Sequence, residues 1–174
     1  MNARKDSEPN PTKNRTTVEP KSEREVVVTR TFDAPARIVF QAWTTPALFK
    51  RWWVPKSMPL ALLSYEADIR VGGSYRLVFG VDGTKTMAFF GKYIEVTPHS
   101  RIVWTNDESG EDGALTTVTL EEMGDRTRMV LHELYRSQEV RDAALASGSY
   151  EGMGETFGQL DEVLVSLGAK AGAM

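Results

Sequence analysis

The 174-residue sequence predicts an α+β domain in which a curved antiparallel sheet of about six to seven strands wraps around a long C-terminal helix. Three observations predict this fold. Short runs of β-branched and aromatic residues alternate with turn signals, and strands joined by tight turns form an antiparallel meander. Two short apolar helical patterns follow the first strand. The long apolar stripe at helical spacing comes last, so it is expected to cover the concave face of the sheet.

The first part of this domain is expected to contain one strand and two short helices. Residues 24–32 carry alternating β-branched side chains, as a strand does. Asp33 can cap the helix that follows, and Pro35 lies where a missing N–H group does no harm. A second short helix is expected to begin at Pro46. The segment is too short to bury its three tryptophans alone, so other elements must cover them: Trp43, Trp52 and Trp53.

Tight turns separate the remaining strands. Asp82-Gly83 is a strong hairpin signal, and glycines at 72–73 and 124 indicate further turns. The strands are expected at 60–68, 74–80, 87–96, 102–105, 116–121 and 127–134. A short helix is expected at 137–146 and the long helix at 150–167. The stripe of the long helix recurs at three- and four-residue steps: Met153, Phe157, Leu160, Leu164 and Leu167.

Composition excludes several classes of function. The chain has 21 basic and 24 acidic residues, and a net charge of -3, with no dense basic segment of the kind that binds nucleic acid. It has no cysteine, which excludes disulfides, thiolate metal sites and a cysteine nucleophile. Its longest apolar run, Leu60 to Leu63, is far below the ~20 residues that span a bilayer. Two separated histidines make no metal site, so we expect no cofactor.

The chain is expected to form one domain, 23–168, with irregular ends. Residues 1–22 are polar and proline-containing, with little to bury, and predict a disordered tail. Residues 169–174 are small and predict a frayed C-terminus. Because no apolar signal segment is visible at the N-terminus, we expect a cytoplasmic location.

Several motifs match a known family in order. They are FDAP at 32–35, VFQAWT at 39–44, WW at 52–53, DIRVGGSYR at 68–76, GKYIEV at 91–96, RIVWT at 101–105 and GM at 152–153. Over about residues 24–167, with these motifs in this order, the chain resembles the SRPBCC superfamily, which has the START-like or helix-grip fold. It is most similar to the family named after the C-terminal domain of the activator of the heat-shock-chaperone ATPase.

The resemblance implies a cavity, and a departure from the family argues against a chaperone as partner. Relatives hold lipids, sterols, polyketides or other apolar molecules in an elongated cavity between the sheet and the long helix. Many carry a tryptophan shortly after the GM motif, where the nearest aromatic residue here is Phe157, and a smaller ring leaves more room. The eukaryotic activator is a longer protein. Nothing in this sequence reads as its chaperone-binding N-terminal half, so a chaperone contact is not expected.

Seven side chains are our candidates for ligand contact. Aromatic rings on strands and helix give broad flat walls, polar tips can orient a ligand, and an imidazole facing inward could donate a hydrogen bond or act as acid or base. The candidates are Tyr75, Phe79, Phe90, Trp104, His132, Met153 and Phe157. The alternative is that the rings fill the interior completely and that the histidine is structural or faces solvent.

We therefore expect this domain to bind or sequester a small hydrophobic or amphipathic molecule between the sheet and the C-terminal helix. One alternative is a cyclase-like or hydrolase-like enzyme of the same superfamily, with His132, Tyr93 or Glu66 as acid or base. Another is a module that contacts a chaperone or regulator through Trp52-Trp53. The expected partner is a small apolar molecule, with no nucleic acid and no membrane, and a homodimer is left open.

Overall fold

The computed structural model describes residues 15–81, 83 and 85–168. Its strands are β1 (Thr17–Pro20), β2 (Glu25–Phe32), β3 (Leu60–Ala67), β4 (Ser74–Val81), β5 (Lys85–Thr97), β6 (Arg101–Thr105), β7 (Leu115–Met123) and β8 (Arg126–Leu134). Its helices are α2 (Ala36–Thr44), α3 (Pro46–Trp52), the 3-10 helix η1 (Asp107–Asp112), α4 (Gln138–Ala146) and α5 (Met153–Ser166). The strands form one antiparallel sheet in the order β1-β2-β8-β7-β6-β5-β4-β3.

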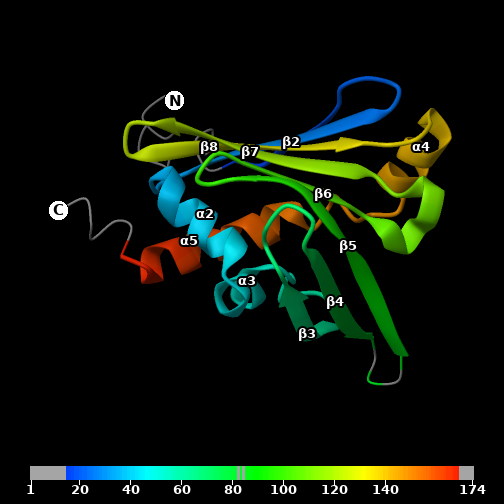
Figure 1. Cartoon of the computed structure of the whole chain (residues 1–174), viewed down its shortest axis with the longest axis horizontal. Helices are drawn as coiled ribbons and strands as arrows, with labels where there is room; N and C mark the ends of the chain where they lie inside the picture. The colour runs from blue at the N-terminus through cyan, green and yellow to red at the C-terminus, as the bar shows by residue number, and fades with distance from the viewer. Residues whose placement is uncertain (1–14, 82, 84, 169–174) are drawn as a thin grey trace, which may run out of the picture.

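The sheet bends, and its concave side holds the helices. Figure 1 shows β3, β4 and β5 turning away from the β2, β8 and β7 half, with α2, α3 and α5 below that half. The pairing register slips at Leu63 on β3 and at Ile94 on β5. Both residues are more than half exposed, as expected of the extra residue in a β-bulge. Because bulges kink and twist a strand, these two help to give the sheet its curvature.

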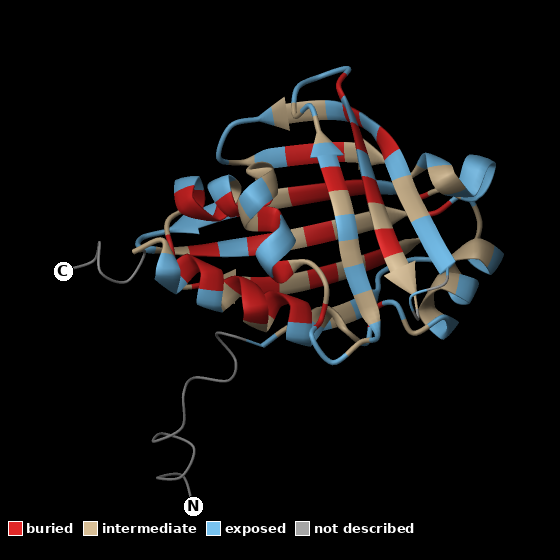
Figure 2. Cartoon of the chain, turned by 90° about the horizontal axis from the view of Figure 1, so that it is seen from below, coloured by how far each residue is buried: buried red, intermediate tan, exposed pale blue. Residues whose placement is uncertain are grey.

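The C-terminal helix packs on the flatter half of the sheet. Alternate residues of β2 are buried and turned toward α5, ending in Phe32, which meets Phe157 edge-to-face at 6.0 Å between ring centroids. Figure 2 shows buried positions on the helices and on the face of the sheet that they cover. Arg30 is only 6% exposed, and its guanidinium donates to Asp161 of α5 at 2.5 Å. An ion pair between a buried arginine and a partly exposed aspartate therefore links β2 to α5.

The three tryptophans of the short helices lie at the junction of the layers. Trp52 is fully buried, and its Nε1 donates to the carbonyl oxygen of Ala42 at 3.1 Å. Trp43 lies 4.9 Å from Trp52 and 6.0 Å from Trp53 between ring centroids. The short helices therefore close one end of the core with tryptophan rings in edge-to-face contact.

The predicted fold class is confirmed, with two differences. The sheet has eight strands because residues 17–20, placed by sequence in the disordered tail, form β1 on β2. Only Val18 there is a large apolar residue, so the alternation expected of a strand is missing. The long helix begins at Met153 rather than at residue 150, after a turn with positive φ at Gly148. The tail expected at 1–14 and the frayed end expected at 169–174 lie outside the described residues.

Candidate functional site

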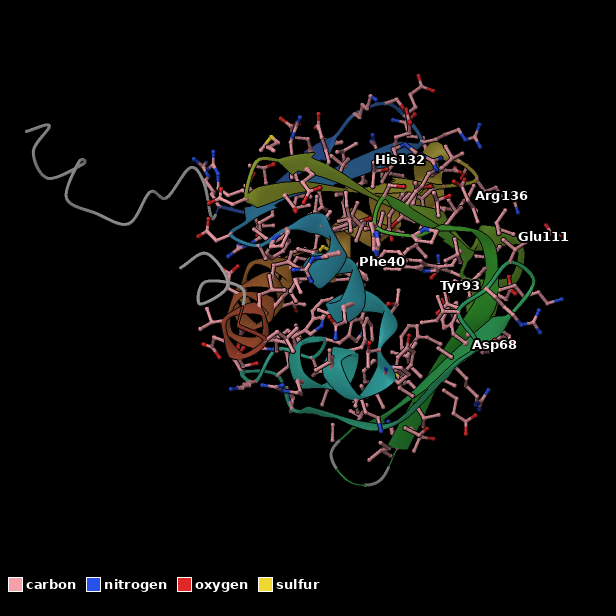
Figure 3. All side chains as sticks on the ribbon, turned by 60° about the vertical axis from the view of Figure 1, so that its left-hand side comes forward. Phe40, Asp68, Tyr93, Glu111, His132 and Arg136 are labelled. Carbon is pink, nitrogen blue, oxygen red and sulfur yellow. The ribbon has the colours of Figure 1, made fainter. Side chains whose placement is uncertain are left out.

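A cavity of about 270 Å³ lies between the short helices and the bent half of the sheet. Nine of the sixteen lining residues are aromatic, which is typical of a small-molecule site. The aromatic residues are Trp43, Phe49, Trp53, Tyr65, Tyr75, Phe79, Phe89, Tyr93 and Trp104. The others are Thr44, Leu60, Ile69, Leu77, Met87, Ile102 and Asn106. Figure 3 labels Tyr93, which belongs to the sheet wall.

Strand alternation builds the sheet wall. On β4, Tyr75, Leu77 and Phe79 are buried, while the residues between them are more exposed. On β5, Phe89 and Tyr93 share the inner face, four residues apart. Side chains on one face of a strand recur every second residue, so the two strands present one continuous aromatic surface.

The helical wall comes from a short stretch of chain. Phe49 of α3 stacks on Trp53 at 4.7 Å between ring centroids and contacts Tyr65 of β3 at 4.6 Å. Trp43 of α2 lies 6.0 Å from Trp104 of β6 and joins the two walls. Its indole Nε1 is buried and has no hydrogen-bond partner among the described residues. Such an unpaired donor is unusual in a protein interior.

The polar side chains at one end of the cavity form hydrogen bonds with other groups of the protein. The hydroxyl of Tyr75 donates to the carbonyl oxygen of Thr105 at 2.7 Å and makes a longer contact, 3.4 Å, with Oδ1 of Asn106. Nδ2 of Asn106 donates to Ala114 O at 2.8 Å and to Oγ1 of Thr116 at 2.9 Å. Both amide hydrogens of Asn106 are therefore committed, which fixes the orientation of its side chain.

The half-buried carboxylate of Glu133 continues this hydrogen-bond network away from the cavity. Thr116 donates to Oε2 of Glu133 at 3.0 Å, and the hydroxyls of Tyr135 and Tyr150 donate to its Oε1 at 2.8 and 2.6 Å. The two tyrosine oxygens are 2.5 Å apart. A continuous polar chain therefore runs from Tyr75 in the cavity to the loop before α5.

The cavity tyrosines remain neutral phenols. Burial raises the pKa of Tyr75 well above its usual value, and the charges of Glu108 and Asp107 raise it further. Burial likewise raises the pKa of Tyr65 and of Tyr93, which share a hydrogen bond. These groups can therefore donate or accept hydrogen bonds, and do not act as bases at neutral pH.

Three of the seven predicted contact residues line the cavity: Tyr75, Phe79 and Trp104. Phe90 does not, because it lies on the opposite face of β5 from Phe89, 38% exposed, with Arg76 over its ring at 5.8 Å. Met153 and Phe157 also lie outside it. Phe157 is packed inside the core against Phe32, so its ring fills the space that a ligand was expected to use.

His132 is also away from the cavity. On β8 it lies on the opposite face of the sheet from the buried Met129 and Leu131. Its Nε2 is 2.5 Å from Oε2 of Glu25. Figure 3 shows His132 well apart from Tyr93. Glu66 is exposed. The three acid–base candidates of the enzyme alternative are therefore not brought together, and the fully buried Trp52 offers no surface to a partner protein.

The position of the cavity corrects the sequence interpretation. No residue of α5 is among the described residues that line it. The hollow lies against α2 and α3 instead, and the apolar side chains of α5 are buried in the core on the flatter half of the sheet. Sequence reasoning left several lining residues out of its candidate set, among them Trp43, Trp53, Phe89, Tyr93 and Asn106. The signal for Phe89 and Tyr93 was their even spacing on β5, which puts both on one face of the strand and Phe90 on the other.

Two further findings concern the described part of the chain. No group of three or more His, Cys, Asp or Glu side chains there could hold a metal ion. No helix there is both long and apolar enough to cross a membrane.

Solved structures share this fold. A crystal structure of a protein from Rhodobacter sphaeroides matches with a TM-score of 0.80 and 24% identity, over 87% of this chain and 99% of that chain. One from Nitrosomonas europaea matches with a TM-score of 0.76 and 25% identity, over 86% and 99%. A solution structure of a protein from Arthrobacter aurescens gives 0.72 and 24%, over 86% and 91%. No curated protein matches the chain.

The family assignment comes from the sequence match. Residues 33–165 match the family described as activator of Hsp90 ATPase homolog 1-like protein. The match begins three residues before α2 and ends one residue before the last residue of α5, and so includes every element that lines the cavity. The chain therefore belongs to the family of activator of Hsp90 ATPase homolog 1-like proteins, as the resemblance in its motifs predicted.

Proposed function

We propose that this protein binds a small apolar or amphipathic molecule in the cavity between α2, α3 and strands β3 to β6. The observation that carries the proposal is the cavity itself, an aromatic space of about 270 Å³ beside the buried hydrophobic core of the domain. Protein interiors leave few voids larger than a water molecule. An apolar cavity of about 150 Å³ is enough to hold benzene, so this one accepts a molecule of one or two rings.

The size of the cavity sets the expected affinity. A ligand of about ten to fifteen heavy atoms, at ~0.5 kcal/mol per atom, gives about 5 to 8 kcal/mol of binding free energy. This corresponds to a Kd between roughly 200 and 1 μM. The expected ligand is therefore compact, and the cavity is too small for a whole long-chain lipid.

The test is a titration with compact neutral probes: indole, 2-naphthol and butylbenzene. Tryptophan fluorescence reports binding directly, because Trp43, Trp53 and Trp104 line the cavity. At least one probe should change the fluorescence saturably and raise the melting temperature. If none of them binds below millimolar concentration, the proposal is wrong.

A pair of variants locates the binding. Leu60→Trp places a larger side chain in the wall of the cavity and should abolish probe binding. Leu63→Trp makes the same change at the exposed bulge of the same strand and should leave binding unchanged. Equal binding by the two variants would show that the probes bind elsewhere.

A further inference from the structure

We propose that this cavity prefers a compact organic cation, such as a quaternary ammonium group attached to a ring, to neutral or anionic molecules of the same shape. The inference rests on the proposed binding function and specifies the charge of the ligand. Three independent features support it: the ring faces, the orientation of the polar groups and the sign of the nearby charges.

Aromatic rings enclose the space on both walls. Phe49 lies 4.7 Å from Trp53 and 4.6 Å from Tyr65 between ring centroids, and on the sheet wall Tyr75 lies 5.7 Å from Tyr93. The face of an aromatic ring is electron-rich and attracts a cation within about 6 Å of its centroid. In a cavity of this size a cation is within reach of several rings. An anion would be repelled by the same ring faces.

The polar groups at one end present oxygen atoms. Both amide hydrogens of Asn106 are used, one by Ala114 and one by Thr116, so the polar atom that its side chain can offer a ligand is Oδ1, 3.4 Å from the hydroxyl of Tyr75. Tyr75 donates its proton to the carbonyl oxygen of Thr105, which leaves its oxygen lone pairs as acceptors. Oxygen acceptors stabilise a cation or an N–H donor and destabilise an anion.

Three carboxylates lie behind this end, those of Asp107, Glu108 and Glu133. Asp107 and Glu108 directly follow the lining asparagine, and Oε1 of Glu108 accepts a hydrogen bond from the backbone N–H of Phe90 at 3.0 Å, which holds η1 against β5. Arg136 pairs with two other acids of η1. Among the described residues, neither Asp107, Glu108 nor Glu133 forms an ion pair with a lysine, arginine or histidine.

The lining itself supplies no positive charge. No lysine, arginine or histidine is among the described residues that line the cavity. A carboxylate, sulfonate or phosphate group would therefore lose its hydration without gaining a counter-ion. A quaternary ammonium group is weakly hydrated, so it loses less on entering and gains the ring faces and the distant carboxylates.

Three probes of nearly equal shape separate charge from size: phenyltrimethylammonium, tert-butylbenzene and benzenesulfonate. We expect the cation to bind roughly 10-fold or more tightly than the neutral probe, and the anion to bind weakest, in fluorescence titrations at low salt. Saturable binding of tert-butylbenzene with equal or higher affinity than the cation would overturn the charge preference while leaving the proposed function intact. Binding by none of the three would overturn both.

A matched pair of double variants tests the source of the preference. Asp107→Asn with Glu108→Gln should weaken binding of the cation by about 3-fold or more and change that of tert-butylbenzene by less than about 2-fold. Glu121→Gln with Asp125→Asn removes the same net charge near the turn between β7 and β8 and should leave both affinities unchanged. An equal loss in the two double variants would assign the effect to net charge alone and overturn the role of η1.

Discussion

Replacing Glu133 tests whether the polar chain behind the cavity is a fixed part of the fold. Its carboxylate accepts hydrogen bonds from Thr116, Tyr135 and Tyr150, whose side chains are all buried. In Glu133→Leu the two tyrosines can still bond each other, because their oxygens are 2.5 Å apart. One tyrosine hydroxyl and that of Thr116 then lose their acceptor. At about 1 to 2 kcal/mol for each buried unsatisfied donor, the expected loss of stability is about 3 kcal/mol.

The amide variant should cost much less. In Glu133→Gln the carbonyl oxygen can still accept from both tyrosines, and the new NH₂ group faces the oxygen of Thr116. One donor is left without a partner, which costs about 1 kcal/mol. The melting temperature should therefore fall by about 6–12 °C for the leucine variant and by about 2–4 °C for the glutamine variant.

The assay is urea unfolding followed by circular dichroism, with the slope of the transition checked for each variant. Glu121→Leu, at an exposed position on β7, is the control for introducing leucine and should change stability by less than about 0.5 kcal/mol. If Glu133→Leu and Glu133→Gln lose the same stability, the hydrogen-bond accounting is wrong. Wild-type stability in the leucine variant would show that the chain contributes nothing to the fold.

The remaining predictions concern two glycines and one surface pair. Gly91→Ala should destabilise the domain by at least about 2 kcal/mol in urea unfolding, because a Cβ there would lie 2.1 Å from a carbonyl oxygen of β6. Gly158→Ala, in the interior of α5 with no atom outside the local helix backbone within 4 Å of the added Cβ, should instead stabilise it by about 0.5–1 kcal/mol, and a loss in the same assay would contradict this. The hydrogen bond from His132 lowers the pKa of Glu25 below 4.5, so the stability from this carboxylate is present at neutral pH and is lost as the pH falls through the lowered value. An NMR titration should show the pKa of Glu25 rising in His132→Ala, and an unchanged value would rule out the proposed cause.

The fold could be predicted because its signals are local. The alternation in β2, β4 and β8, the proline at the start of α3 and the apolar stripe of α5 each specify one element. Strand β1 could not be found in this way. Its residues pair with β2 through backbone hydrogen bonds, and only Val18 packs against the core. An edge strand of this kind gains its stability from its neighbour and leaves little pattern in its own residues.

Local signals did not specify the site. Which side chains face a cavity depends on how they alternate between the two faces of each strand. On β5, Phe89 and Phe90 are adjacent phenylalanines, so residue type alone does not tell which of them lines the cavity. They lie on opposite faces of the sheet. The alternation of faces continues along a strand only as far as the next bulge. At Ile94 it changes, so that Val96 packs against the core although it is three residues from the inward-facing Tyr93.

The same bulges explain why the cavity lies beside the short helices and not beside α5. Where the sheet is flatter, Phe157 and Leu160 are buried in one hydrophobic cluster with side chains of β2 and β8. Beyond the slips at Leu63 and Ile94 the sheet turns away from α5 (Figure 1), and the layer facing it is made of rings on α2 and α3. Rings are rigid and cannot extend into the wider gap as a long aliphatic side chain could. We infer that the hollow results from two one-residue insertions opposite a rigid aromatic layer.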